Sequence, residues 1–165
     1  MIDNLKTRDY EGSRGRWLRL IGIVGGVLLW AACAGGGLAA ETKVLDGNPG
    51  RGGETLDLKP LLSRDHATVV DFYSPYCPPC VQVAPLLDEL AKRKPETVFV
   101  KLNINRPQVR GIDWKSPLTQ QYRLKSVPYF MIFKPEGKLA AEGPEAQKII
   151  IDWLQKAELL PKSGK

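Results

Sequence analysis

The sequence has few of the side chains that bind metal ions. Its 165 residues include one histidine, His66, and three cysteines, Cys33, Cys77 and Cys80. A structural zinc site needs about four nitrogen or sulfur ligands, and no second pair of closely spaced cysteines completes such a set. Copper bound by two thiols and a distal histidine is also disfavoured, because the single histidine precedes the cysteine pair. We interpret His66 as a solvated residue of a polar turn and predict no metal.

The sequence also lacks a run of basic residues, an internal repeat and, after residue 53, any low-complexity tract. Lysine and arginine number 24 and the acidic residues 18, so the net charge is +6. Residues 1–19 contribute +2 and residues 41–165 contribute +4. We interpret this diffuse basicity as an ordinary solvated surface. Because no aromatic residues alternate with the basic ones, nucleic acid is not predicted as a partner.

Charged residues are absent from a stretch of 21 residues, 20–40. The stretch is long enough to cross a bilayer, and three arginines between residues 14 and 19 precede it. Basic residues before an apolar segment keep the N-terminus in the cytoplasm and direct the chain after the segment outward. We therefore expect residues 1–40 to be a signal peptide or a membrane anchor. Residues 17–40 would export the rest to the periplasm or hold it at the outer face of the cytoplasmic membrane.

Three fates of this segment stay open. The small residues Gly37, Ala39 and Ala40 offer cleavage sites for a signal peptidase. An uncleaved anchor would carry Gly22 and Gly26 as a small-xxx-small pair. Lipidation at Cys33 is the third, because Ala-Ala-Cys followed by Ala-Gly-Gly-Gly resembles the lipobox and tether of bacterial lipoproteins, although Trp30 replaces the usual leucine. All three fates place the remaining chain outside the cytoplasm.

The rest of the chain is expected to form one α/β domain. Residues 41–53 are rich in turn-forming residues without an apolar period, which predicts a flexible linker before a domain at 54–165. Residues 55–62 predict a short strand or a turn that leads into a helix. Hydrophobic patterns after them predict a β-α-β-α-β-β-α order and hence a central mixed sheet with helices for both faces. The expected strands are 68–73, 97–102, 127–133 and 138–142, and the expected helices are 78–93, 117–122 and one that starts at 143–144.

Cys77 and Cys80 lie three positions apart, directly after the β-branched strand. An apolar period of Val81, Ala84, Leu87 and 90–91 follows, so we expect Cys77 at the N-terminus of a helix. Unpaired N–H groups and the helix dipole at that position favour a thiolate, which is the species that attacks disulfides. The motif therefore predicts thiol–disulfide exchange. A purely structural disulfide is the alternative, although a four-residue ring constrains little of the unfolded chain.

Prolines occupy three informative positions near this motif. Pro78 and Pro79 suit the first helical turn, where the N–H groups that they lack would be unpaired. Pro85 falls inside the same helix and is expected to kink it. Pro128 follows Val127 at the head of a strongly apolar strand, which predicts a first strand residue or a strained turn.

Asp71 is an acid within an otherwise apolar strand, six residues before Cys77. Burial of a carboxylate costs free energy, so the residue either faces the surface or has a functional role. We favour a position beneath Cys80, where desolvation would raise the pKa of Asp71 and let it exchange a proton with the thiol. Lys101, at the end of the next strand, would pair with Asp71 if the two strands are neighbours.

Residues 55–160 resemble the thioredoxin superfamily. The matches are Val-Asp-Phe followed by C-P-P-C, Pro85, the Lys-Leu-Asn-Ile of 101–104, Val127-Pro128, and the stretch from Phe133 to Gly143. The resemblance implies a thioredoxin fold and a redox-active disulfide in place of a cofactor. It implies that Cys77 is the nucleophile, that Cys80 is the resolving thiol and that Asp71 is its proton partner, with Lys101 nearby. It also implies a supporting role for Pro85. Substrate contacts would come from Tyr76, Val127 and Pro128, with a cis bond between the last two.

The chain also departs from thioredoxin. Tyr73 and Tyr76 replace tryptophans, Pro-Pro replaces Gly-Pro between the cysteines, and extra sequence lies between Asn103 and Pro128. With the export segment, this resembles the tethered thioredoxin-like proteins of bacterial envelopes. We expect a reductase of envelope protein disulfides, among them apocytochrome c, that is supplied by a membrane electron donor. Alternatives are an envelope dithiol oxidant or isomerase, and a non-catalytic binding module.

Overall fold

The computed structural model describes residues 44–161. The predicted signal or anchor segment, with Cys33, and the first residues of the predicted linker lie outside the described residues. Within 44–161 no helix has the length and apolar character needed to cross a membrane. The elements are β1 (Leu45–Asp46), η1 (Lys59–Leu61), β2 (Ala67–Tyr73), α1 (Pro78–Arg93), β3 (Thr97–Asn103), α2 (Pro117–Gln121), β4 (Tyr129–Phe133), η2 (Pro135–Gly137), β5 (Leu139–Glu142) and α3 (Gly143–Lys156), where η marks a short 3-10 helix.

Five strands form one mixed sheet in the order β1-β3-β2-β4-β5. Strand β3 runs parallel to both β1 and β2, whereas β4 runs antiparallel to β2 and to β5. The predicted strands and helices are confirmed to within a few residues at their ends. The α/β class with a mixed sheet is confirmed as well. At residues 55–62 only the 3-10 turn η1 forms, so the alternative of a strand there is wrong.

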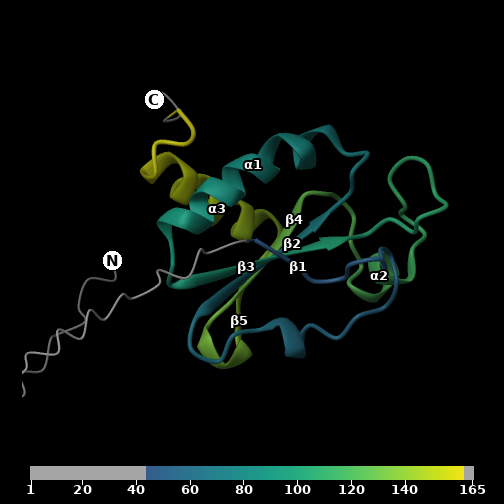
Figure 1. The fold of residues 1–165 in the computed structure, drawn as a ribbon, viewed down its shortest axis with the longest axis horizontal. Coiled ribbons are helices and arrows are strands. Elements are labelled where there is room, and N and C mark those ends of the chain that lie inside the picture. Colours follow the sequence, from purple (N-terminus) through teal and green to yellow (C-terminus); the bar gives the residue numbers. More distant parts are fainter. Residues whose placement is uncertain (1–43, 162–165) are drawn as a thin grey trace, which may run out of the picture. The chain divides into compact units, whose positions relative to one another are not determined.

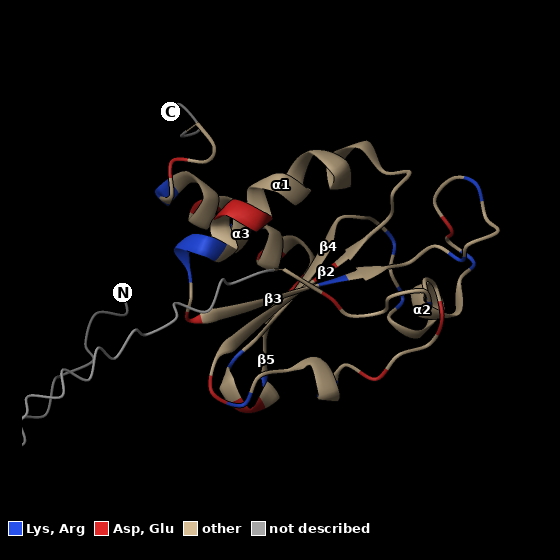
Figure 2. Ribbon diagram, viewed as in Figure 1, with Lys and Arg blue, Asp and Glu red and all other residues tan. Residues whose placement is uncertain are grey.

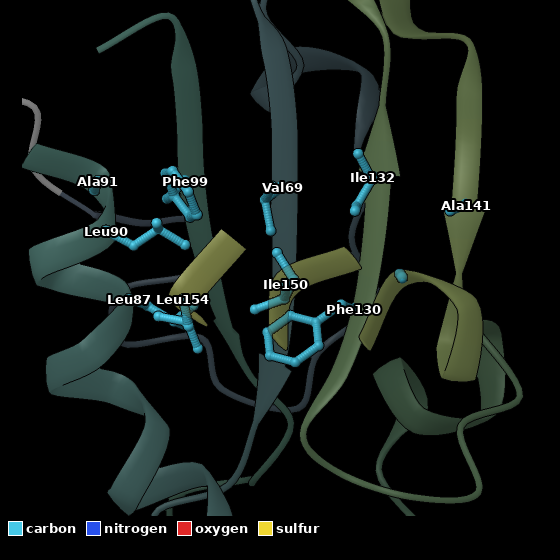
Figure 3. Packing of buried hydrophobic residues seen from close by; sticks show 11 residues of the cluster. Val69, Leu87, Leu90, Ala91, Phe99, Phe130, Ile132, Ala141, Ile150 and Leu154 are labelled. Carbon is cyan, nitrogen blue, oxygen red and sulfur yellow. The ribbon is translucent and has the colours of Figure 1, made fainter. Parts of the chain in front are cut away.

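Helices cover both faces of the sheet (Figure 1). Helices α1 and α3 lie together on one face, where their apolar side chains pack on Val69, Phe99 and Phe130 (Figure 3). Leu118 of α2 packs on the opposite face against Phe72 and its neighbours. The two faces alternate along β2, because successive side chains of a strand point to opposite sides. The predicted apolar face of α3 is confirmed, since all six of its members belong to the first cluster: Ala146, Ile149, Ile150, Trp153, Leu154 and Ala157.

The buried face of α1 differs from the predicted one in its first turns. Val81 is 56% exposed, and Ala84 is exposed as well. The residues buried in this helix are Cys80, Leu87, Leu90 and Ala91. A helical face repeats every three to four residues, so a face that starts at Cys80 excludes Val81. The prediction failed because it counted the cysteine as chemistry only, whereas a cysteine side chain is also a small hydrophobic group.

The prediction of a flexible linker at 41–53 is wrong for its described part. Leu45 and Asp46 pair with β3 as an edge strand, and buried Asn48 exchanges two hydrogen bonds of 2.9 Å with the backbone of Asn103. Gly53 has a φ of +76°, and a Cβ added there would lie 2.8 Å from the backbone nitrogen of Arg106. The glycines thus permit close backbone packing rather than flexibility.

Candidate active site

Cys77 and Cys80 form a disulfide at the N-terminus of α1, with 5.3 Å between their Cα atoms. Strand β2 ends at Tyr73, a short turn follows, and Cys77 is the N-cap residue of the helix. The Cys77 amide donates a 3.1 Å hydrogen bond to the carbonyl of Ser74, which closes this turn. The predicted position of Cys77 at a helix N-terminus is confirmed.

The helix supplies one amide to the sulfur of Cys77. The N–H of Cys80 points at the Cys77 Sγ over 3.2 Å, and neither Pro78 nor Pro79 has an N–H to add. On reduction this amide and the positive end of the helix dipole stabilise a thiolate at Cys77. The geometry therefore favours Cys77 over Cys80 as the sulfur that attacks.

The segment that leads into strand β4 lies directly against this sulfur. The Cys77 Sγ is 3.4 Å from the carbonyl oxygen of Val127, and the bond between Val127 and Pro128 is cis, as the resemblance implied. Strand β4 begins at the next residue, Tyr129. The sheet thus brings residues 50 positions apart in the sequence together at one end, where backbone groups of Val127 lie beside the disulfide. Backbone in this position suits pairing with an extended peptide.

Both cysteines of the disulfide are buried. Cys77 and Cys80 are each 2% exposed, whereas Tyr76, Pro78 and Pro79 around them are exposed. A substrate disulfide therefore meets a small target that is bordered by Tyr76 and Val127. The predicted contact residues Tyr76 and Val127 thus lie on either side of Cys77.

Asp71 is buried on the face of the sheet that α1 covers. It is 6% exposed, and it shares its face with Val69, two residues before it, and with Phe130, its partner on β4. Its Oδ1 has no hydrogen-bond partner among the described residues. Burial raises the pKa of Asp71 to about 7, and the positive charge of Lys101 acts in the opposite direction. The raised pKa agrees with the predicted desolvation of this acid.

Lys101 lies opposite Asp71 in the register of β2 and β3. The two strands are neighbours, which was the condition for this pairing, and the lysine acts on the acid through its charge. Between residues 44 and 161 no salt bridge joins the two side chains, so the predicted pairing is electrostatic only. Pro85 lies exposed inside α1, which continues past it to Arg93.

Sequence reasoning missed a second buried acid, Asp113. Its side chain is 3% exposed and accepts hydrogen bonds from Arg106 Nε at 2.7 Å and from an Arg106 terminal nitrogen at 3.0 Å. The amides of Arg106 and Lys115 also donate to it. These bonds hold the pKa of Asp113 below its usual range. An acid seven residues after an arginine was the available signal, but loop spacing alone does not predict a contact.

The described residues contain no group of three or more His, Cys, Asp or Glu side chains placed to hold a metal ion. His66 is exposed, and its backbone amide donates to the Ser63 hydroxyl, which fits the predicted polar turn.

The sequence profile of the family described as Thioredoxin matches residues 58–156. The chain belongs to the thioredoxin family. The thioredoxin of Rickettsia typhi is 32% identical over 99 residues, which cover 59% of this chain and 87% of that protein. The thioredoxin of Mycoplasmoides gallisepticum is 32% identical over 84 residues, or 51% of this chain and 75% of that protein.

Solved thioredoxin structures share the fold. Thioredoxin from Trypanosoma brucei brucei superposes with a TM-score of 0.51 at 18% identity and covers 74% of this chain and 96% of its own. Spinach chloroplast thioredoxin f, in its short form, superposes with a TM-score of 0.50 at 22% identity and covers 71% of this chain and 95% of its own. Thioredoxins are disulfide oxidoreductases that act on protein disulfides through a redox-active disulfide. With its C-x-x-C disulfide in place, this chain is a thioredoxin-like thiol–disulfide oxidoreductase.

Proposed function

We propose that this thioredoxin-family protein reduces protein disulfides outside the cytoplasmic membrane. The observation that carries the chemistry is the position of the Cys77 sulfur, between the Cys80 amide at 3.2 Å and the Val127 carbonyl at 3.4 Å. The amide stabilises a thiolate, and the Val127 backbone offers an edge on which an extended substrate can be held beside it.

The reaction transfers two electrons from the cysteine pair to the substrate. The Cys77 thiolate attacks one sulfur of the substrate disulfide, that S–S bond breaks, and the released substrate thiolate takes up a proton. Cys80 then loses its proton and attacks Cys77 in the mixed disulfide, which forms the Cys77–Cys80 bond and releases the second substrate thiolate. The protein is left oxidised, in the disulfide form that the structure shows.

Asp71 is proposed to accept the proton of Cys80. A group with a pKa of about 7 is divided between its acid and its base form near neutral pH, which suits proton transfer in both directions. Its position supports this role, because Asp71 lies on the face covered by α1, and Cys80 belongs to the buried side of that helix.

Export rests on the uncharged stretch 20–40 and the arginines before it. In an oxidising compartment a reductase needs a continuing source of electrons. We therefore propose a membrane protein as the donor that returns two electrons and two protons to the Cys77–Cys80 disulfide. The direction of the reaction is tested by the reduction potential of this pair. A potential close to −270 mV, as in thioredoxin, supports a role as a reductase, and a potential close to −120 mV, as in DsbA, contradicts that role.

The central test uses two cysteine variants. Cys77→Ser is expected to abolish reduction of insulin disulfides, because no attacking sulfur remains. Cys80→Ala is expected to accumulate mixed disulfides with its substrates, because the resolving thiol is gone, and the trapped proteins identify those substrates. Wild-type protein that fails to reduce insulin in the presence of dithiothreitol contradicts the enzymatic proposal.

A non-catalytic binding module is the second candidate, and the 2% exposure of Cys77 is the observation that favours it. Such a module would hold an extended partner along Val127 and Pro128 without exchange at the sulfur. In that case Cys77→Ser and wild-type protein would bind the same partners with equal affinity, and neither would form a mixed disulfide.

A further inference from the structure

The segment 104–128 carries the net positive charge of the described domain. Residues 44–161 contain 16 basic and 14 acidic side chains, and five of the basic ones but only one acid fall within 104–128. The remainder of the described domain therefore has a small excess of acid. The charge that appears diffuse along the sequence is concentrated in one segment.

This segment begins beside the end of strand β2 and ends beside the disulfide. At its start, the amide of Ile104 donates to the carbonyl of Tyr73, the last residue of β2, over 2.9 Å. Near its end, the Val127 carbonyl lies 3.4 Å from the Cys77 sulfur. Lys125 is two residues before Val127, so their Cα atoms are within about 8 Å of each other. Figure 2 shows the basic positions of the loops on either side of α2 in blue.

Among the residues that the structure describes, four of the five basic side chains have no acidic partner. Arg106 is bound to Asp113, the single acid of the segment. In the part of the chain that the structure describes, the other four form no salt bridge, and all are exposed: Arg110, Lys115, Arg123 and Lys125. The described salt bridges of the remaining domain instead pair lysines and arginines with nearby acids.

Acids that border the segment are already engaged. Glu54 accepts from Arg51, Asp57 accepts from the amide of Lys59, and Glu142 accepts from the Tyr129 hydroxyl at 3.3 Å. Two exposed aromatic residues, Tyr76 and Trp114, lie in the active-site loop and within the segment. Exposed aromatic and arginine side chains are typical of protein-binding surfaces.

We propose that residues 104–128 select disulfide substrates whose target cysteine is flanked by acidic residues. This inference rests on the proposed reductase function and adds its substrate class. Unpaired cations around a catalytic sulfur raise the local concentration of acidic chains and accelerate their encounter with it. Lys125 and Arg123 contact residues next to the target cysteine, and Arg110 and Lys115 act at longer range.

The first test needs no variant. Two peptides of equal length each carry one internal disulfide, flanked in one by four glutamates and in the other by four lysines. Pre-reduced protein supplies the two electrons, and stopped-flow mixing measures the second-order rate constant of a single turnover. We expect the acidic peptide to react about tenfold faster at 20 mM salt. The ratio of the two rate constants should fall to about twofold at 0.5 M salt, because the Debye length then shrinks to about 4 Å.

The second test reverses the charges. The variant R110E/K115E/R123E/K125E is expected to invert the preference at low salt. A matched control, K59E/R64E/K134E/K138E, changes the net charge equally at exposed positions of the other end of the sheet. The control should keep the preference of the wild type for the acidic peptide. If the fourfold variant does not fold, the pair R123Q/K125Q should reduce the preference by about half on a logarithmic scale.

The outcomes distinguish failure of the acidic-substrate inference from failure of the proposed reductase function. Equal rates for both peptides at low salt, or an equal loss of preference in the control variant, overturn the acidic-substrate inference. Hydroxyethyl disulfide, a small uncharged substrate, tests the reductase function by itself. Wild-type protein that reduces this compound but shows no peptide preference retains its function and loses only the substrate class. Wild-type protein that reduces none of the three loses both.

Discussion

Two buried carboxylates of this domain have opposite environments, and their pKa values change in opposite directions. Asp113, in the loop after β3, has an arginine and two backbone amides as partners, and its pKa is lowered. Asp71, in the middle of β2, has an Oδ1 without a partner among the described residues and a pKa raised to about 7. The first arrangement stabilises the ionised form, and the second destabilises it.

The difference shows which acid maintains the fold and which one is available for chemistry. A satisfied, ionised carboxylate stays ionised at all physiological pH values, so Asp113 cannot exchange protons near neutrality. Asp71 titrates near neutral pH, at a cost in stability that a purely structural residue would not justify. Replacing each residue therefore tests the comparison directly.

The largest expected effect comes from Asp71→Asn. The pKa of Asp71 in the folded state, about 7, exceeds the 3.8 of the unfolded chain. The folded state therefore holds the proton more tightly, and this group's contribution to stability is lost as the pH rises from about 4 to about 7. The loss is about 4 kcal/mol. Denaturant unfolding of the oxidised proteins should show that the variant lacks this decline, and parallel pH profiles for both proteins would contradict it.

Asp113→Ala should have the next largest effect. Removal of the carboxylate leaves the Arg106 guanidinium and two backbone amides without their acceptor, and because the arginine is partly solvated the cost is about 1–2 kcal/mol of the free energy of unfolding. The lowered pKa makes the stabilisation by Asp113 present at neutral pH and lost as the pH falls through its folded pKa. The difference between wild type and variant should therefore shrink in acid, opposite in sign to the Asp71 effect. Urea unfolding at pH 7 and pH 3 measures both values.

Arg106→Lys should cost less of the free energy of unfolding than Asp113→Ala. Lysine keeps the charge but loses the two-pronged contact that the guanidinium makes with both oxygens of Asp113. Thermal unfolding at pH 7 provides the measurement. A loss as large as that of Asp113→Ala would show that charge is not what stabilises the loop.

The smallest effect is expected for Lys101→Met. The positive charge of Lys101 lowers the pKa of Asp71, so its removal should raise that pKa further. At pH 8 the variant should be less stable than wild type by less than about 1 kcal/mol, because the lysine is partly solvated. Carboxyl titration by NMR gives the direction, and a downward shift of the midpoint would exclude the proposed electrostatic contact.

Local patterns predicted most of the fold and the chemical centre. The strand before Cys77, the helix after it and the short helix expected at 117–122 depend on residues close in sequence, and the structure confirms each of them. Strand β1 was missed because two residues carry no periodicity, and their pairing with β3 depends on residues 55 positions away. The exposed Val81 and the buried Cys80 show that a helix face is decided by what packs against it.

The sequence by itself determined the cysteine pair, its place at a helix N-terminus and an acid in the preceding strand, because each follows from the spacing of neighbouring residues. Only the tertiary structure decided that the Val127 carbonyl lies against the Cys77 sulfur and that Asp71 is desolvated while Asp113 is paired. These properties depend on burial and on contacts between distant segments, which the folded sheet creates and a linear pattern does not contain.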